Sequence, residues 1–522
     1  MMNQMNPTNP NPLPNDVVLS PPRPSYQQLN WDEEKRVKAV ANDRMSGIFL
    51  LLVFLVCTLM SEAVFRSGLK IGTVVYFAAY TLLLYPFMLR GGAKLNWRAA
   101  LLTLPIGLIS LSYGLFDGHS TRFITLPVLL VLCALQIVYL VRPDKKVLLD
   151  FSNLRELLSV TLCKPFRYIT APFEVFSRKT GERKNPVLLY ILLGVLLACP
   201  LLLLFLCLFA SADDQFASLA GRVWSWVHTN LFSLFADILL GVLLTLFAAP
   251  LFIVCKAKMN NKPREEKQPI TLHTIILATA LILLLLLVLL FSAIQFEQLF
   301  LSRSWKLYEY AQQARGGFFQ MTLASALLFV IAACVIRLSK KSGDRLPFAI
   351  SIPTFLLCCC NLLILWSAAA RMLDYIDAAG LSQKRILTLW LMALLAFSTL
   401  VVIAKILWLS LHAVRWIGIA TVCAVCLLSL LNIDRIVAED HLARNTDQLD
   451  TYYLSELSCS AAPAVAKAYQ ETDNPELKEQ LRCVLDNYQI ALAHRENLFS
   501  YTLDQPEIQR ALSVLQQTSS AD

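Results

Sequence analysis

Long apolar runs separated by short charged segments dominate the chain. The run "LILLLLLVLLF" (281–291) is the most extreme. An apolar helix of about 18 residues or more can cross a hydrocarbon core of about 30 Å. The pattern therefore predicts an all-α, polytopic transmembrane helix bundle of about 11 spans with a small C-terminal helical domain. The expected spans are residues 46–65, 71–89, 99–116, 123–141, 187–210, 231–254, 270–294, 317–336, 347–369, 386–407 and 411–431.

Lys and Arg are distributed unevenly between the segments that flank these spans. Starting from the N-terminal tail, alternate segments hold 29 of these residues when Lys405 and Arg415, near the facing ends of the last two spans, are included, whereas the intervening loops hold 10. Cytoplasmic loops of membrane proteins carry such an excess. We therefore expect a cytoplasmic N-terminus, and the odd number of spans then gives an extracytoplasmic C-terminus.

The polar regions divide the chain into five expected parts. Residues 1–45 are rich in Pro and Asn and are expected to form a disordered cytoplasmic tail. Residues 46–141 hold the first four spans and residues 187–432 hold the rest. Residues 142–186 form the longest cytoplasmic loop. Residues 433–522 contain 15 acidic and 7 basic residues and are expected to form an acidic, extracytoplasmic helical domain.

The long cytoplasmic loop carries an amphipathic pattern. Leu149, Leu154, Leu157 and Leu158 recur at roughly helical intervals, with Lys and Arg nearby. Such a helix is typical of segments that lie on an anionic inner leaflet. A docking site for a cytoplasmic protein is the alternative interpretation.

The C-terminal segment has recognisable helix starts. In "DNPELKEQL", Asn474 can cap a helix, Pro475 suits the first helical position, and Glu476 complements the helix dipole. The stretch "DQPEIQRALSVLQQ" repeats this pattern around Pro506. The segment is the second region where we expect a protein partner.

Two of the 14 cysteines, Cys459 and Cys483, lie in this C-terminal segment. In an oxidising compartment they could form a disulfide, although geometry decides whether two cysteines can pair. Two buried thiols are the alternative. Most other cysteines lie inside apolar runs, where they behave as small hydrophobic residues.

Motifs for common chemistries are missing from the sequence. There is no phosphate-binding Gly-rich loop with Lys-Ser or Lys-Thr, no HExxH helix and no GxSxG turn. We therefore predict no catalytic residue, no metal site and no cofactor. The net charge of +9 resides in short loops beside apolar runs, so the lipid bilayer, and not nucleic acid, is the expected partner.

Ionisable residues at membrane depth are the first candidates for function, because burying a charge there is costly. Glu62, Asp237 and Glu297 lie within or at the ends of spans, and a proton or ion path could use them. A polar contact between helices is the alternative for each.

A second candidate site is expected on the outer face. It comprises Glu309, Arg315, Arg371 and Asp374. The first two belong to "YEYAQQARGGFFQ" (308–320), an aromatic-rich segment of the kind found at membrane interfaces. Its two glycines at 316–317 would relax the backbone where the chain enters the bilayer.

Several ordered motifs resemble a known family. They are "SADDQF", "FSAIQFEQLF", "ARGGFFQM", "SAAARMLDYIDAAGLSQKRILTLW", "NIDRIVAEDHLAR" and "LDTYYLSELSCSAAPAV". Together they resemble a bacterial multi-pass membrane family classed as a domain of unknown function, most clearly over residues 290–485. Gln298 and Gln313 stand where that family usually has tyrosine. The resemblance implies a protein of the bacterial cytoplasmic membrane and supplies no activity.

Three functions stay open on this basis. A transporter or permease fits the buried acidic residues and the number of spans. A membrane sensor, or a partner subunit of a signalling or envelope complex, fits the polar tail, the long loop and the C-terminal domain. An enzyme acting within the membrane is the third alternative.

Overall fold

The protein is helical throughout the stretches that its structure, a computed structural model, describes. These stretches cover most of the expected spans and the C-terminal segment. They are residues 26–41, 46–63, 68–90, 94–118, 121–140, 158–171, 233–257, 274–300, 307–339, 346–444, 450–493 and 498–519.

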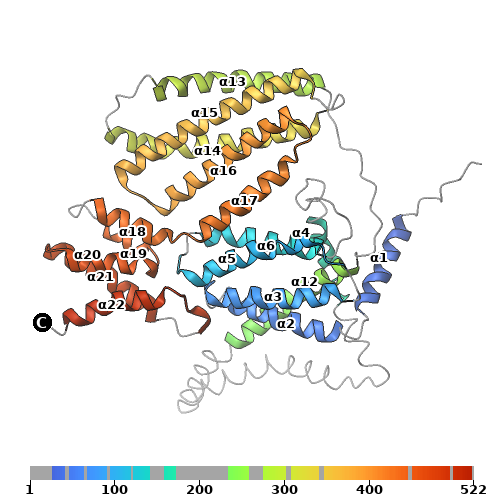
Figure 1. Ribbon diagram of the computed structural model, residues 1–522, viewed down its shortest axis with the longest axis horizontal. Coiled ribbons are helices and arrows are strands. Elements are labelled where there is room, and N and C mark those ends of the chain that lie inside the picture. The colour runs from blue at the N-terminus through green and yellow to red at the C-terminus, as the bar shows by residue number, and fades with distance from the viewer. Residues whose placement is uncertain are drawn as a thin grey trace, which may run out of the picture.

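The membrane-type helices form two bundles, one beside the other (Figure 1). The first bundle contains α2 (Ser46–Ser61), α3 (Ile71–Leu89), α4 (Trp97–Ala100), α5 (Thr103–Leu115), α6 (Arg122–Tyr139) and α12 (Ser233–Ala257). The second bundle contains α13 (Thr274–Phe300), α14 (Leu307–Leu338), α15 (Phe348–Ala379) and α16 (Gln383–Leu407). Helix α17 (Ala413–Ser429) packs against α5 and α6 on one side and α16 on the other, so it joins the bundles.

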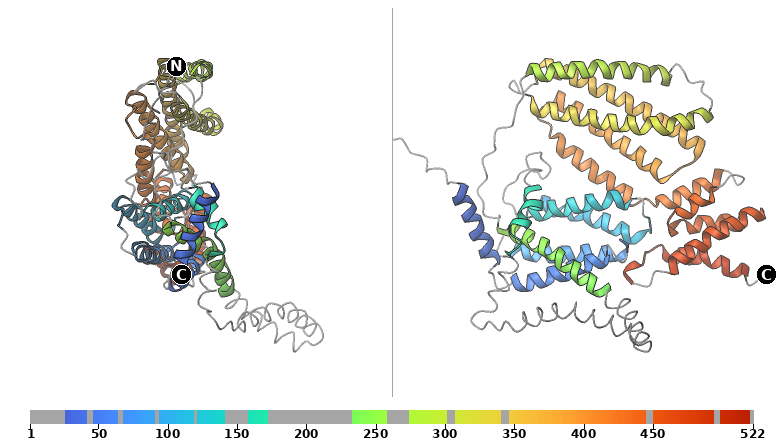
Figure 2. Two further views of the ribbon diagram at one scale, coloured as in Figure 1. Left: turned by 90° about the vertical axis from the view of Figure 1, so that its right-hand side faces the viewer. Right: turned by 180° about the vertical axis from the view of Figure 1, so that it is seen from behind.

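The remaining helices lie at the two ends of the first bundle (Figures 1 and 2). Helix α1 (Tyr26–Ala41), the π-helical turn η2 (Ser159–Cys163) and α8 (Lys164–Arg167) lie at one end. The C-terminal domain lies at the other. It comprises α18 (Ile433–Arg444), α19 (Thr451–Glu456), η5 (Cys459–Ala461), α20 (Ala462–Glu471), α21 (Pro475–Ala493), η6 (Leu498–Ser500) and α22 (Gln505–Ser519).

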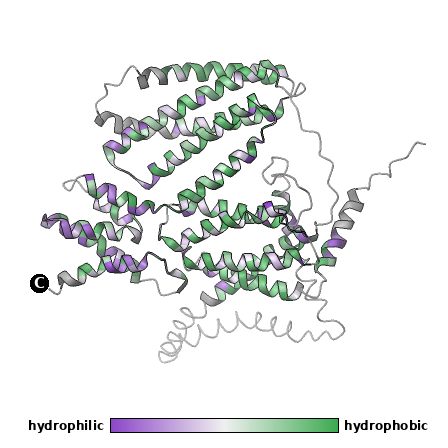
Figure 3. Cartoon of the chain, viewed as in Figure 1, coloured by the Kyte–Doolittle hydropathy of each residue, from purple (hydrophilic) through white to green (hydrophobic). Residues whose placement is uncertain are grey.

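Each group of helices has an apolar core of its own. Leu84 and Ile109 are fully buried in the first bundle, Leu357 in the second, and Leu481 and Ile508 in the C-terminal domain. The helices of both bundles consist largely of apolar residues, as the hydropathy colouring in Figure 3 shows, and many of their large apolar side chains are exposed, among them Leu82 and Leu283. Large apolar side chains exposed on a bundle surface are expected where that surface faces lipid.

Among the described residues, eight helices are long and apolar enough to cross a membrane, and a ninth is counted if α17 and α18 form one span bent by 59°. The predicted number of about 11 is therefore not confirmed. Helix α2 has only 16 residues, which is short for a span. The expected span 187–210 lies outside the described residues.

The start of α21 confirms the capping prediction. Asn474 Oδ1 accepts a hydrogen bond of 3.0 Å from the Glu476 amide, and Pro475 is the first helical residue. The capping pattern around Pro506 also begins a helix, because α22 starts at Gln505.

The structure does not join the two cysteines of the C-terminal domain. Cys459 is buried, and its Sγ lies 3.7 Å from the carbonyl oxygen of Tyr488, whereas the thiol of Cys483 is exposed. The buried face of α21 carries Leu481, Val484 and Leu485, so Cys483 points away from the core that holds Cys459. The structure thus records both cysteines as free thiols, one buried and one exposed.

Candidate functional site

Charged side chains are buried where the first bundle meets the C-terminal domain. They come from the loops that join the helices at that end, and from α6. Lys70 precedes α3, Asp117 follows α5, and Arg122 begins α6. Their side chains are 9, 3 and 7% exposed, respectively.

These three side chains form an ionic cluster. Lys70 Nζ lies 3.2 Å from Asp117 Oδ1, and Arg122 Nη2 lies 4.0 Å from the same oxygen. Arg122 also donates to the carbonyl oxygens of Gly68 at 2.6 Å and Phe116 at 3.4 Å. Buried charges lose hydration, so each depends on its partners, and removing one partner leaves the others poorly compensated.

A hydrogen-bonded chain connects this cluster to the C-terminal domain. The Asp117 amide donates to Ser460 Oγ at 3.0 Å, and Ser460 Oγ donates to the carboxylate of Asp504. Burial raises the pKa of Asp504, although the hydrogen bond from Ser460 opposes this effect. We call Lys70, Asp117, Arg122, Ser460 and Asp504 together the junction network.

The backbone around Asp504 is docked onto the same helix ends. The amides of Leu503 and Asp504 donate to Gly114 O at 2.8 Å and to Leu115 O at 3.2 Å. On the other side, the Ile71 amide donates to Tyr501 O at 3.3 Å. Residues 501–504 therefore connect α3 to α5, and they place Asp504 beside Asp117.

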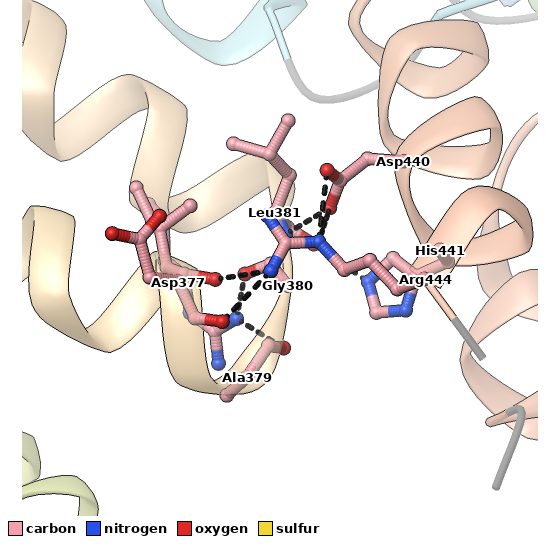
Figure 4. Close-up of polar contacts among 9 residues, drawn as sticks. Asp377, Ala379, Gly380, Leu381, Asp440, His441 and Arg444 are labelled. Carbon is pink, nitrogen blue, oxygen red and sulfur yellow. Dashed lines mark hydrogen bonds and ion pairs between the residues drawn. The ribbon is translucent and has the colours of Figure 1, made fainter. Parts of the chain in front are cut away.

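A second contact attaches the C-terminal domain to the second bundle (Figure 4). Helix α15 ends at Gly380, whose φ of +75° favours glycine. The following Leu381 amide donates to Asp440 Oδ2 at 2.7 Å, and Leu381 O lies 2.6 Å from His441 Nε2. Two neighbouring residues of α18 thus satisfy both backbone groups of one loop residue.

Arg444 extends this contact onto the end of α15. Its guanidinium donates to the carbonyl oxygens of Ile376 at 3.0 Å and Asp377 at 2.9 Å, and it pairs with Asp440 at 2.9 Å. Carbonyl groups at a helix C-terminus have no partner within the helix and carry partial negative charge. Arg444 of α18 donates hydrogen bonds to these carbonyl groups, and its positive charge complements their partial negative charge. We call Asp440, His441 and Arg444 with their partners the loop clamp.

Between the junction network and the loop clamp lies a third buried acid, Asp434 at the start of α18. It is 1% exposed and accepts hydrogen bonds from Gln383 Nε2 and Ser458 Oγ. A cavity of about 20 Å³ adjoins it, large enough for one water molecule. The cavity is lined by Ser112, Tyr113, Phe116, Gly118, Thr121, Arg122, Ser429, Leu431, Asn432, Ile433 and Asp434.

Two of the predicted ion-path residues lie at one helix contact. Asp237 of α12 is 9% exposed and accepts a hydrogen bond of 2.8 Å from Ser61 Oγ of α2. Glu62, the next residue of that chain segment, is half-buried. The helices pack closely here, because a Cβ on Gly241 would lie 2.4 Å from Thr58 Oγ1. This close packing is typical of a polar contact between helices.

The other predicted site residues lie on helices of the second bundle. Glu297 is near the end of α13, and Glu309 and Arg315 are near the start of α14; their side chains lie outside the described residues. Arg371 is half-buried and Asp374 exposed near the end of α15. These helix ends lie at the same end of the bundle, on the side of the C-terminal domain (Figure 1).

The sequence did not point to the junction network. Lys70, Asp117 and Arg122 flank apolar runs, where charges are common, and Ser460 is 343 positions from Asp117. The signal in the sequence was that Asp117, Lys70 and Arg122 lie at the ends of neighbouring expected spans, all on the expected outer face.

The fold and these contacts define a class: a helical protein whose described part holds eight or nine helices of membrane-spanning character and an acidic C-terminal domain attached to both bundles. The chain belongs to the family described as "Domain of unknown function (DUF4153)", which it matches over residues 77–468. The resemblance in the sequence motifs is thereby confirmed. No curated protein and no solved structure matches the chain.

Proposed function

We propose that this protein is a membrane-embedded sensor or partner subunit. In this proposal the C-terminal domain lies outside the cytoplasm, receives a contact there, and transmits it to the membrane helices. The protein would reside in the cytoplasmic membrane, with its N-terminus inside, as the excess of Lys and Arg in alternate segments favours.

The junction network is the observation that carries this proposal. A C-terminal domain that was only an accessory to a transporter would not require buried charges where it attaches to the membrane helices. Here Lys70, Asp117 and Arg122 are almost fully buried, and Asp117 is hydrogen-bonded to the C-terminal domain through Ser460. Because each buried charge depends on the docked geometry, a displacement of the domain would change the interactions at the ends of α3, α5 and α6.

The outer surface of the domain offers places for a partner to bind. Tyr452 of α19 is 75% exposed and Ile490 of α21 is 57% exposed. Exposed aromatic and aliphatic side chains on a polar domain are typical of contact surfaces.

A photo-crosslinking experiment in cells tests the proposal. With p-benzoylphenylalanine in place of Tyr452 or Ile490, we expect one dominant protein adduct of defined mass. The matched control carries the same crosslinker in place of Gln470, which is exposed on α20. Introducing Asp117→Asn should then reduce the specific adduct several-fold relative to the amount of protein present, because the domain is no longer held in place. Equal adducts at Gln470, or no effect of Asp117→Asn, would contradict this function.

Transport is the second candidate, favoured by the buried Asp237, which lies near the start of α12 at one end of its contact with α2. Under this alternative, Asp237→Asn abolishes a proton or ion flux in proteoliposomes while Asp117→Asn leaves it intact. The close approach of Gly241 to Thr58 favours a packing role for this contact, so we rank transport second.

A further inference from the structure

Residues 158–171 form a short helical segment with an exposed apolar stripe. Leu158, Leu162, Phe166 and Ile169 are 50, 52, 65 and 39% exposed. Their spacings of four, four and three residues place them on one face of a helix. The segment lies outside the expected spans, so its apolar face needs a separate explanation.

The opposite face of this segment is packed against the protein. Val160, Tyr168 and Ala171 are buried, at 1, 8 and 4% exposure. Tyr168 and Ala171 share an apolar cluster with the last turns of α12 and with α1. That cluster comprises Val37, Ala41, Tyr168, Ala171, Ile253, Val254 and Ala257. The segment is therefore held at a fixed position, with only one face available to its surroundings.

The contact with α12 sets the depth of the segment. The ring of Phe166 lies 5.6 Å from that of Phe247, measured between centroids. Phe247 lies ten residues before the end of α12 at Ala257, which corresponds to about 15 Å along the helix axis. Since α12 is long and apolar enough to cross a membrane, the ring of Phe166 reaches the acyl chains when α12 does so. Tyr168 and Ala171 pack against the last turns of α12, so the rest of the segment lies nearer the end of that helix.

Basic residues accompany the apolar stripe. Lys164 and Arg167 lie within the segment, and Lys35 is exposed on the neighbouring α1. The surrounding stretch 142–186 contains 10 basic and 5 acidic residues. An apolar face beside basic side chains is the pattern of helices that bind anionic membranes in the interface plane.

We propose that residues 158–171 form an in-plane interfacial helix whose partner is an anionic phospholipid leaflet. The stripe of Leu158, Leu162, Phe166 and Ile169 enters the acyl region, continuous with the apolar surface of α12. Lys164 and Arg167 remain at the level of the headgroups, where they attract phosphate-bearing lipids. Docking on α1 and α12 makes this helix a sensor of leaflet charge at the end of the molecule opposite the C-terminal domain.

Photo-crosslinking in nanodiscs tests the proposal with the full-length chain. The discs contain equal parts of phosphatidylcholine and phosphatidylglycerol, and p-benzoylphenylalanine replaces Phe166 or Leu162. Mass spectrometry should find intact phospholipid adducts at both positions, with phosphatidylglycerol enriched over its share of the disc. The same crosslinker in place of Gln470, exposed on the C-terminal domain, should give no lipid adduct.

A pair of variants tests whether the enrichment of phosphatidylglycerol requires the positive charge of the segment. Arg167→Gln should reduce the phosphatidylglycerol enrichment several-fold, whereas Lys467→Gln on α20 should leave it unchanged. Protein adducts in place of lipid adducts at Phe166, equal lipid yields at Gln470, or adducts that match the bulk composition would each overturn the proposal. None of these outcomes depends on the function proposed for the C-terminal domain.

Discussion

Asp504 is a titratable residue at the contact between the C-terminal domain and the first bundle. It lies on the segment that connects α3 to α5, and its carboxylate accepts a hydrogen bond from Ser460. Burial raises its pKa above the ordinary value of 3.8, and the nearby Asp117 adds to this effect. The hydrogen bond from Ser460 lowers the pKa, but burial outweighs it.

The raised pKa has a defined consequence for stability. Between pH 3.8 and the raised value, the docked state binds more protons at Asp504 than the unfolded state does. The contribution of Asp504 to the free energy of unfolding therefore falls as the pH rises through this window. At neutral pH the charged carboxylate opposes docking, and at the acidic end of the window this opposition is gone.

We predict that Asp504→Asn raises the unfolding temperature of the detergent-solubilised protein at pH 7. The amide oxygen of asparagine can still accept the hydrogen bond from Ser460, while the cost of a buried charge disappears. The difference from the wild-type protein should shrink as the pH is lowered towards 4. Glu476→Gln, a change at an exposed acid of α21, serves as the control. A difference that stays constant with pH, or a less stable Asp504→Asn protein, would contradict the assignment.

At the scale of elements, the apolar pattern predicted the helices better than their ends. The expected span 71–89 coincides with α3, because the apolar run and the helix have the same limits. Helix α14, in contrast, begins at Leu307 and runs through the glycines at 316–317, where we expected a relaxed entry into the bilayer. Good helix formers such as Gln312, Gln313 and Ala314 precede the two glycines, and each glycine lowers the stability of the helix by only about 1 kcal/mol relative to alanine.

The site could not be predicted in the same way. Apolar periodicity identifies which residues face a core, but it does not say which helix ends meet. The loop clamp joins Leu381 to Asp440 across 59 positions, and Gln383 reaches Asp434 across 51. Only the folded arrangement brings these residues together, so neither contact has a signature in the local sequence.

Gly380 allows a direct test of the loop clamp. Its φ of +75° and ψ of +175° belong to a region that is almost restricted to glycine, and a Cβ there would lie 3.2 Å from His441 Cε1. Gly380→Ala should therefore destabilise the protein by about 1–3 kcal/mol, measured by thermal or chemical unfolding in detergent.

The control for this prediction is Gly107→Ala in α5, where nothing lies within 4 Å of the added Cβ. That change should be neutral or slightly stabilising, because alanine favours helices. Equal effects of the two substitutions would show that the loop conformation at Gly380 is not required.

At the scale of the whole molecule, the C-terminal domain joins two bundles that otherwise share few connections. Helix α17 links them within the membrane-type region, and Trp390 Nε1 of α16 donates to Ala424 O of α17 at 3.1 Å. Outside the membrane-type region, the C-terminal domain contacts the first bundle through the junction network and the second bundle through the loop clamp. A change at either contact is thus able to reach both bundles.

Asp117 is the residue on which this connection depends most, since it is the counter-charge of Lys70 and Arg122. Removing one member of a buried ionic cluster typically costs about 3–5 kcal/mol, because the remaining charges stay buried without compensation. Asp117→Asn should therefore increase hydrogen–deuterium exchange in α18–α22 and at the ends of α3 and α5, measured in nanodiscs. Adding Lys70→Met removes a charge that has lost its ion pair with Asp117 and should restore part of the protection. If exchange rises only around residue 117, or if Lys70→Met worsens it, the junction does not hold the domain in place.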